Sequence, residues 1–223
     1  MAIEVETKDT TALSDSEIEE MADMCVGQPL PFEVGALSKQ AEAWVLVTTA
    51  RMGAKLKGFA FCTLERTGGT PSVLIGLGSV ATGSRSDSIL RGIVTDQLRR
   101  AVLAFPDEDV LFGVQIIRPA GFAVLKGLDG IVPAPDHKTS GEERAWGRRL
   151  AKRFGVGSLS YDDRQFRVSG KGSLANAVDF DSAKDQDVDD VTAGFFDGID
   201  APNGDSLIAL GWAMAEELDK LAR

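Results

Sequence analysis

The sequence contains very few of the residues that build metal centres and disulfide scaffolds. Its 223 residues include one histidine, His137, and two cysteines, Cys25 and Cys62. One histidine excludes a multi-histidine metal site, and two cysteines are too few for a structural zinc site or a disulfide framework. We therefore predict no metal, and we expect both thiols to be free, as they are in a reduced, cytoplasmic protein.

Positive charge is also in short supply. The chain has 24 Lys and Arg against 34 Asp and Glu, a net charge of −10. Such a chain repels nucleic acid and anionic lipid, so neither is an expected partner. The longest uncharged stretch, residues 67–84, contains a proline and several glycines and is not expected to span a membrane. Hydrophobic residues make up 43 % of the chain, as in an ordinary globular protein.

Local patterns predict a helix followed by three antiparallel strands. Ser14 and Glu17 have the spacing of a capping box at a helix start, and Gly27 ends the helix. Three runs rich in β-branched and aromatic residues follow, and their short connections indicate an antiparallel meander. The predicted strands cover residues 44–50, 58–66 and 72–81.

Helices and strands alternate in the next part of the chain. Apolar residues at helical spacing from Leu90 to Phe105 predict a long helix, and the apolar run 110–117 predicts a buried strand. From the whole pattern we infer an α/β (α+β) fold with a central mixed, mostly antiparallel sheet flanked by helices. The remaining predicted elements are a short helix over 120–126, an amphipathic helix over 141–154 and a strand or hairpin over 158–169.

An acidic segment follows. Residues 172–204 are rich in aspartate and predict a solvated connector. Asp185, Asp187 and Asp189 alternate as in a calcium loop, but the glycine and the final glutamate of such a loop are absent, so no calcium site is predicted.

The last residues are expected to form an amphipathic helix over 205–223. Leu207, Leu210, Met214 and Leu218 recur at helical spacing there. We therefore expect a domain over 1–171, an acidic connector and a C-terminal helical extension. The apolar stripe of that helix is a candidate homodimer interface, because it needs a partner surface.

The order of elements over Leu13–Ser169 resembles the GNAT acyltransferase superfamily. In that family an acyl-CoA lies against the splayed centre of the sheet. A loop of pattern Gln/Arg-x-x-Gly-x-Gly/Ala binds its pyrophosphate through backbone amides at a helix start. The equivalent stretch of this sequence is TGSRSDSILR, residues 82–91. Arg85 matches the first position, whereas Ser88 and Leu90 occupy the two small-residue positions.

The resemblance implies acetyl-CoA or another acyl-CoA as cofactor, and an amine of a small molecule or protein as acceptor. Asp87 stands in the first helical turn, where its carboxylate would compete with a phosphate. A second interpretation stays open, in which Ser86 only caps the helix and no anion binds. The implied cofactor-binding residues are Val80, Ala81, Gly83, Arg85, Ser86, Ser88 and Ile89.

Candidate catalytic groups are few. The family often carries a tyrosine as general acid four residues before a glycine, but here Ala123 precedes Gly127, and the only tyrosine, Tyr161, belongs to another element. Glu65 and His137 are candidate bases for the amine proton, with an ordinary surface residue as the alternative interpretation of each. The resemblance thus implies either a divergent N-acyltransferase or a catalytically inactive protein of the same fold that serves as a binding or assembly module.

Overall fold

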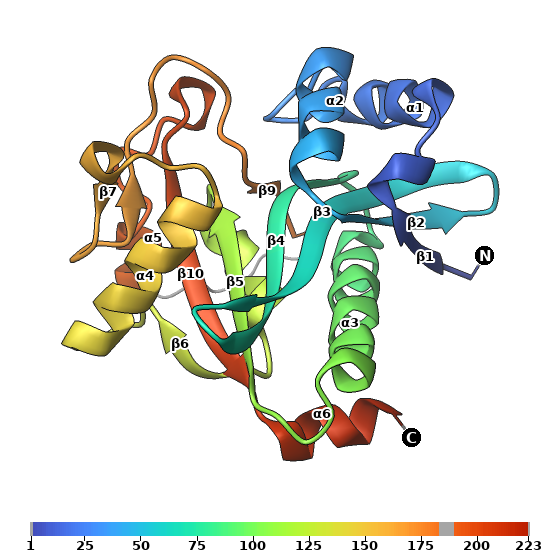
Figure 1. Cartoon of the computed structure of the whole chain (residues 1–223). Coiled ribbons are helices and arrows are strands. Elements are labelled where there is room, and N and C mark those ends of the chain that lie inside the picture. The colour runs from blue at the N-terminus through green and yellow to red at the C-terminus, as the bar shows by residue number, and fades with distance from the viewer. Residues whose placement is uncertain (1, 183–189, 223) are drawn as a thin grey trace.

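The computed structural model describes residues 2–182 and 190–222, so Asp185, Asp187 and Asp189 lie outside the described residues. In the described part, one sheet runs through the molecule in the order β1-β2-β3-β4-β9-β5-β10-β8-β7, with β6 paired to β10 (Figure 1). Most neighbouring strands are antiparallel, and the pairs among β4, β5 and β9 are parallel. The predicted fold class, a mixed and mostly antiparallel sheet flanked by helices, is confirmed.

The first half of the sheet is the predicted meander with one additional strand on its edge. Gly53 and Gly68 adopt φ of 60° in the tight turns between the strands, a conformation that glycine reaches without steric cost. The added strand β1 consists of alternating charged and half-buried residues, and it pairs antiparallel with β2. The strands are β1 (Glu4–Asp9), β2 (Leu46–Met52), β3 (Lys55–Thr67) and β4 (Thr70–Val80).

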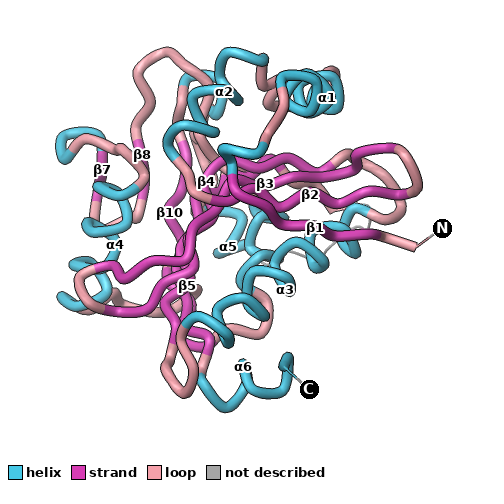
Figure 2. The backbone as a smooth tube through the Cα atoms, turned by 45° about the vertical axis from the view of Figure 1, so that its right-hand side comes forward, coloured by secondary structure: helices cyan, strands magenta, loops and turns pink. Residues whose placement is uncertain are grey.

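Helices cover both faces of this meander. The helices α1 (Asp15–Cys25) and α2 (Val34–Ala43) lie on one face, and α3 (Ser86–Ala104) lies on the other (Figure 2). Each helix turns its apolar side to the sheet, which buries Met21 of α1 and Leu37 of α2. Among the described helices, none combines the length and the apolar character that a membrane crossing requires.

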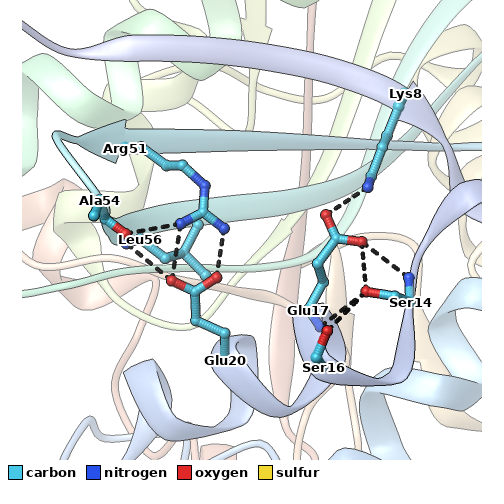
Figure 3. Close-up of polar contacts among 8 residues, drawn as sticks. All are labelled: Lys8, Ser14, Ser16, Glu17, Glu20, Arg51, Ala54 and Leu56. Atoms are coloured by element: carbon cyan, nitrogen blue, oxygen red, sulfur yellow. Dashed lines mark hydrogen bonds and ion pairs between the residues drawn. The ribbon is translucent and has the colours of Figure 1, made fainter.

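The capping box predicted at the start of α1 is confirmed (Figure 3). The Ser14 amide donates to Glu17 Oε2 at 2.9 Å, and the Glu17 amide donates to Ser14 Oγ at 3.3 Å. Lys8 of β1 donates to the same glutamate, and Arg51 of β2 pairs with Glu20 one turn later. The bonds from Lys8 and the Ser14 amide lower the pKa of Glu17 to about 2. These contacts fix α1 to the sheet edge.

From β5 to the hairpin β7–β8, the chain follows the predicted order, with one strand, β6, that was not predicted. The short helix predicted over 120–126 is a 3-10 helix, and the hairpin predicted over 158–169 is present. Trp146 of α4 packs edge-to-face on Trp212 at 5.9 Å between ring centroids, which holds α4 against the sheet. The elements are β5 (Val110–Ile116), η2 (Pro119–Leu125), β6 (Asp129–Val132), α4 (Gly141–Arg153), β7 (Tyr161–Asp162) and β8 (Arg167–Val168). Three single-turn 3-10 segments join them at Thr10–Ala12, Ser158–Ser160 and Ala201–Asn203.

The helix predicted over 205–223 is wrong for its first half. Residues Ser206–Ala213 form β10, which pairs antiparallel with β5 in the interior of the sheet, and only Ala215–Ala222 form a helix, α6. Leu207 and Leu210 are therefore buried in the core and offer no stripe to a second copy. A strand buried on both faces carries a continuous apolar run, and such a run matches helical spacing by chance.

The expected connector over 172–204 also enters the sheet. Val178–Asp179 form β9, between β4 and β5, and a short helix α5 follows at Asp190–Gly194. The division into a domain, a connector and a terminal helix does not describe this chain, since β9 and β10 belong to the same sheet as the rest.

Candidate functional site

The centre of the sheet opens between β4 and β5, at the place where the resemblance puts an acyl-CoA. The two strands pair in parallel from Ser72 opposite Leu111 to Ile75 opposite Val114, and beyond that point their direct pairing ends. A strand end that leaves its neighbour exposes backbone N–H and C=O groups, which need other partners. The opening is therefore the natural place for an extended ligand to bind.

The chain's own strand β9 fills this opening. Val178 lies opposite Gly78 of β4 and opposite Ile116 of β5, so it bridges the two diverging strands. The amide of Gly78 also donates to the carbonyl of Ala177 at 3.3 Å. The Gly78 amide, which the opening would otherwise expose, is thus already paired within the chain.

Side chains of the same segment are part of the hydrophobic core. Ala177 and Phe180 are fully buried, and Val178 is nearly so. Phe180 is among the largest completely buried side chains of the described residues. At about 25 cal/mol per Å² of apolar surface, exposing such side chains again would be costly.

One buried carboxylate anchors the segment. Asp179 is 3 % exposed, accepts a hydrogen bond from the Leu30 amide at 2.9 Å and pairs with Arg118 at 3.3 Å. Burial raises the pKa of Asp179, while the Leu30 amide and the guanidinium of Arg118 oppose that shift. These contacts tie β9 to the segment before α2 and to the end of β5. The role of Asp179 was not predicted, because aspartates flank Phe180 in a segment that resembles a solvated connector.

The loop before α3 collects most of the predicted cofactor-binding residues. Ala81, Gly83, Arg85, Ser86 and Ile89 line a cavity of about 190 Å³, together with Met52 and Lys57. This volume is below the roughly 300–1,000 Å³ of typical ligand pockets. Val80 is buried and Ser88 is exposed, and neither lines the cavity.

The amides at the start of α3 are partly used by the loop itself. The Ser86 amide donates to the Gly83 carbonyl at 3.0 Å, and the Ile89 amide donates to the Arg85 carbonyl at 3.0 Å. The helix cap is Arg85, with no side-chain bond, so the cap expected from Ser86 is absent. Asp87 accepts a bond from Ser182 Oγ at 2.8 Å, which brings the segment after β9 onto this turn.

The two candidate bases do not meet at this loop. Glu65 lies opposite Ser72, at the start of β4, whereas the loop follows Val80 at its end, about 26 Å along the strand at about 3.3 Å per residue. Both oxygens of Glu65 accept from Arg153 Nε at 2.9 Å, so the carboxylate is held in an ion pair. His137 Nε2 lies 2.8 Å from Glu143 at the start of α4, and it does not line the loop cavity.

Among the described residues, neither Ala123 nor Tyr161 supplies the proton donor that the resemblance would require. Ala123 lies in η2 as expected. The hydroxyl of Tyr161 is buried so closely against Gly147 of α4 that a side chain at that glycine would clash with it. Burial raises the pKa of Tyr161, which makes it a poor acid. Within residues 2–182 and 190–222, no cluster of histidine, cysteine and carboxylate side chains is suited to a metal.

Comparisons with known proteins find similarity in three dimensions only. No family model matches the sequence, and no curated protein matches it. Among solved structures, the ribosomal-protein-S18-alanine N-acetyltransferase from Escherichia coli is similar over 95 % of each chain, with 8 % identity and a TM-score of 0.48. An acyl-CoA N-acyltransferase from Pseudomonas aeruginosa is similar over 50 % of this chain and 79 % of its own, with 16 % identity and a TM-score of 0.37.

A putative acetyltransferase of the GNAT family from Desulfovibrio desulfuricans is similar over 52 % of this chain and 76 % of its own, with 14 % identity and a TM-score of 0.38. All three similarities have less than 20 % identity and a TM-score below 0.5.

Proposed function

We propose that this chain is a GNAT-like protein that does not transfer acyl groups and acts through binding. The observation that carries this proposal is β9, which occupies the opening between β4 and β5 with its own backbone. An acyl-CoA in that opening would need the backbone groups of β4 that β9 already uses. We further propose that the protein works in the cytoplasm, in keeping with two free, buried cysteines.

The distribution of charged groups supports the same conclusion. Removing a proton from an ammonium requires a base within hydrogen-bond reach of the acceptor amine. Glu65 is engaged by Arg153 at the other end of β4, and His137 is engaged by Glu143. Neither candidate base is available beside the opening.

Divergent N-acyl transfer from acetyl-CoA to an amine is the second candidate function. The observation in its favour is the small cavity at the α3 start, where Lys57 and Arg85 accompany the helix N-terminus. In this alternative, β9 must leave the sheet before the cofactor enters.

Calorimetric titration of the full chain with acetyl-CoA up to about 1 mM separates the two functions. We expect no saturable heat, which corresponds to a binding free energy weaker than about −4.1 kcal/mol. A parallel assay of thiol release from acetyl-CoA, with polyamine and peptide amines as acceptors, should show no protein-dependent rate.

Saturable binding together with thiol release would contradict the proposal. The matched variants Arg85→Ala and Arg99→Ala then distinguish a specific site from general charge attraction. Arg85 belongs to the loop cavity, whereas Arg99 is exposed on α3 and does not line it. Loss of binding in the Arg85 variant alone would establish the acyl-CoA site.

A further inference from the structure

A cavity of about 400 Å³ lies between α3, η2, the end of β10 and α6. It shares no lining residue with the β4–β5 opening or with the loop cavity. Its volume is within the roughly 300–1,000 Å³ of typical small-molecule sites. The apolar part of the wall consists of Leu90, Val94, Leu98, Leu128, Leu218 and Leu221.

The geometry of α3 explains why one wall is apolar. Leu90, Val94 and Leu98 are four residues apart, so they form one stripe along the helix. Leu218 and Leu221 of α6 face this stripe across the cavity. Residues that line a cavity in this way leave apolar surface that a hydrocarbon chain would cover.

The four charged residues of the cavity wall are not equivalent. Asp87 accepts a hydrogen bond from Ser182, and Glu217 pairs with Lys220, so both carboxylates have partners. The side chains of Arg91 and Lys126 form no hydrogen bond and no ion pair within the described part of the chain. The wall therefore combines apolar surface with two cations whose side chains are unpaired, beside two carboxylates that already have partners.

We propose that this cavity binds a free aliphatic carboxylate of medium chain length. The hydrocarbon chain lies along the leucine stripe, and the carboxylate accepts hydrogen bonds from Arg91 and Lys126. Charge-assisted bonds of this kind are stronger than neutral ones and give the ligand its orientation. The inference rests on the proposed binding role and gives it a ligand class, at a cavity separate from the sheet opening.

Calorimetric titration of the full chain with sodium decanoate tests the proposal. We expect one-to-one, saturable binding that weakens as sodium chloride is added, because salt screens the exposed cations. Sodium acetate, which lacks the chain, and decyltrimethylammonium, which carries the opposite charge, should both give no saturable heat.

Matched variants locate the site. Arg91→Gln and Lys126→Gln should each weaken decanoate binding by about fivefold or more. Arg99→Gln, on the same helix but outside the cavity, should leave it unchanged. Thr95→Trp places a large ring in the cavity and should abolish binding, and circular dichroism checks that the variant is folded. All three glutamine variants change exposed side chains and are expected to fold.

Three results would overturn the inference. They are no decanoate binding, equal binding of the decyl cation, and equal effects of the Arg91, Lys126 and Arg99 variants. An acetyl-CoA titration of the same sample keeps the two proposals distinguishable. If neither ligand binds, only the cavity proposal fails, and if acetyl-CoA alone binds and also releases its thiol, the proposed absence of acyl transfer fails as well.

Discussion

Phe180→Ala tests whether the β9 segment is a permanent part of the core or a displaceable plug. Phe180 is fully buried beside the strand that fills the sheet opening. Truncating a fully buried phenylalanine removes the free energy of transfer of its ring and leaves a cavity, which together cost about 3–5 kcal/mol. If the segment belongs to the core, the variant should lose that much free energy of unfolding.

Urea denaturation followed by tryptophan fluorescence measures the effect. The control is Leu103→Ala, on the outer side of α3, where the side chain is 82 % exposed. A change at such a site is usually within about 0.5 kcal/mol. A loss below about 1 kcal/mol for Phe180→Ala, with an unchanged denaturant slope, would refute the reasoning, because a plug that detaches easily contributes little to global stability.

Three further perturbations have expected outcomes. Burial raises the pKa of Cys25 to about 11 and of Cys62 to about 12. Neither thiol should therefore react with a thiol-specific reagent at pH 8 in the native protein, and both should react in guanidinium chloride. A fast reaction in the native protein would contradict their burial. Because the pKa of Asp179 is raised, its contribution to stability is present below its unfolded pKa of about 3.9 and is lost as pH rises through the folded value. As pH rises from about 4, the free energy of unfolding of Asp179→Asn should therefore increase relative to that of the natural protein. A difference that decreases as pH rises would contradict this prediction. Gly76→Ala places a Cβ 2.3 Å from the ring of Trp44. The free energy of unfolding, measured by thermal denaturation, should therefore fall by about 1–3 kcal/mol. An unchanged midpoint would mean that the ring moves freely.

The elements that the sequence predicts well are those whose signals are local. The capping box of Ser14 and Glu17 involves neighbours three residues apart, and the structure reproduces it. The strands of the meander are joined by tight turns at Gly53 and Gly68, so their pairing also follows from nearby residues.

The elements that were missed depend on distant partners. Leu207–Ala213 has no alternation, because β10 is buried between β5 and β8, and its apolar residues fit a helix equally well. The short strand β9 is defined only by pairing with Gly78 and Ile116, far away in the chain. No pattern within β9 itself indicates this pairing.

The position of the loop before α3 was predictable, whereas cofactor binding by its residues stays a prediction. The loop over residues 81–86 lies beside the start of α3, as the resemblance implied, and five of the predicted residues line its cavity. Whether the sheet opening is empty depends on Val178 and Asp179, which the sequence places in an acidic segment. Glu65 was chosen for its position at a strand end, but its partner Arg153 comes from α4, and only the folded structure brings the two together.

Native-state hydrogen exchange at β9 tests the central claim most directly. The amide of Gly78 and the amides of β9 should exchange slowly, with opening free energies close to that of global unfolding, since the segment is part of the core. Addition of about 1 mM acetyl-CoA should leave these rates unchanged. Rapid exchange of the β9 amides, or exchange that accelerates when acetyl-CoA is added, would show that the strand leaves the opening, and it would contradict the account.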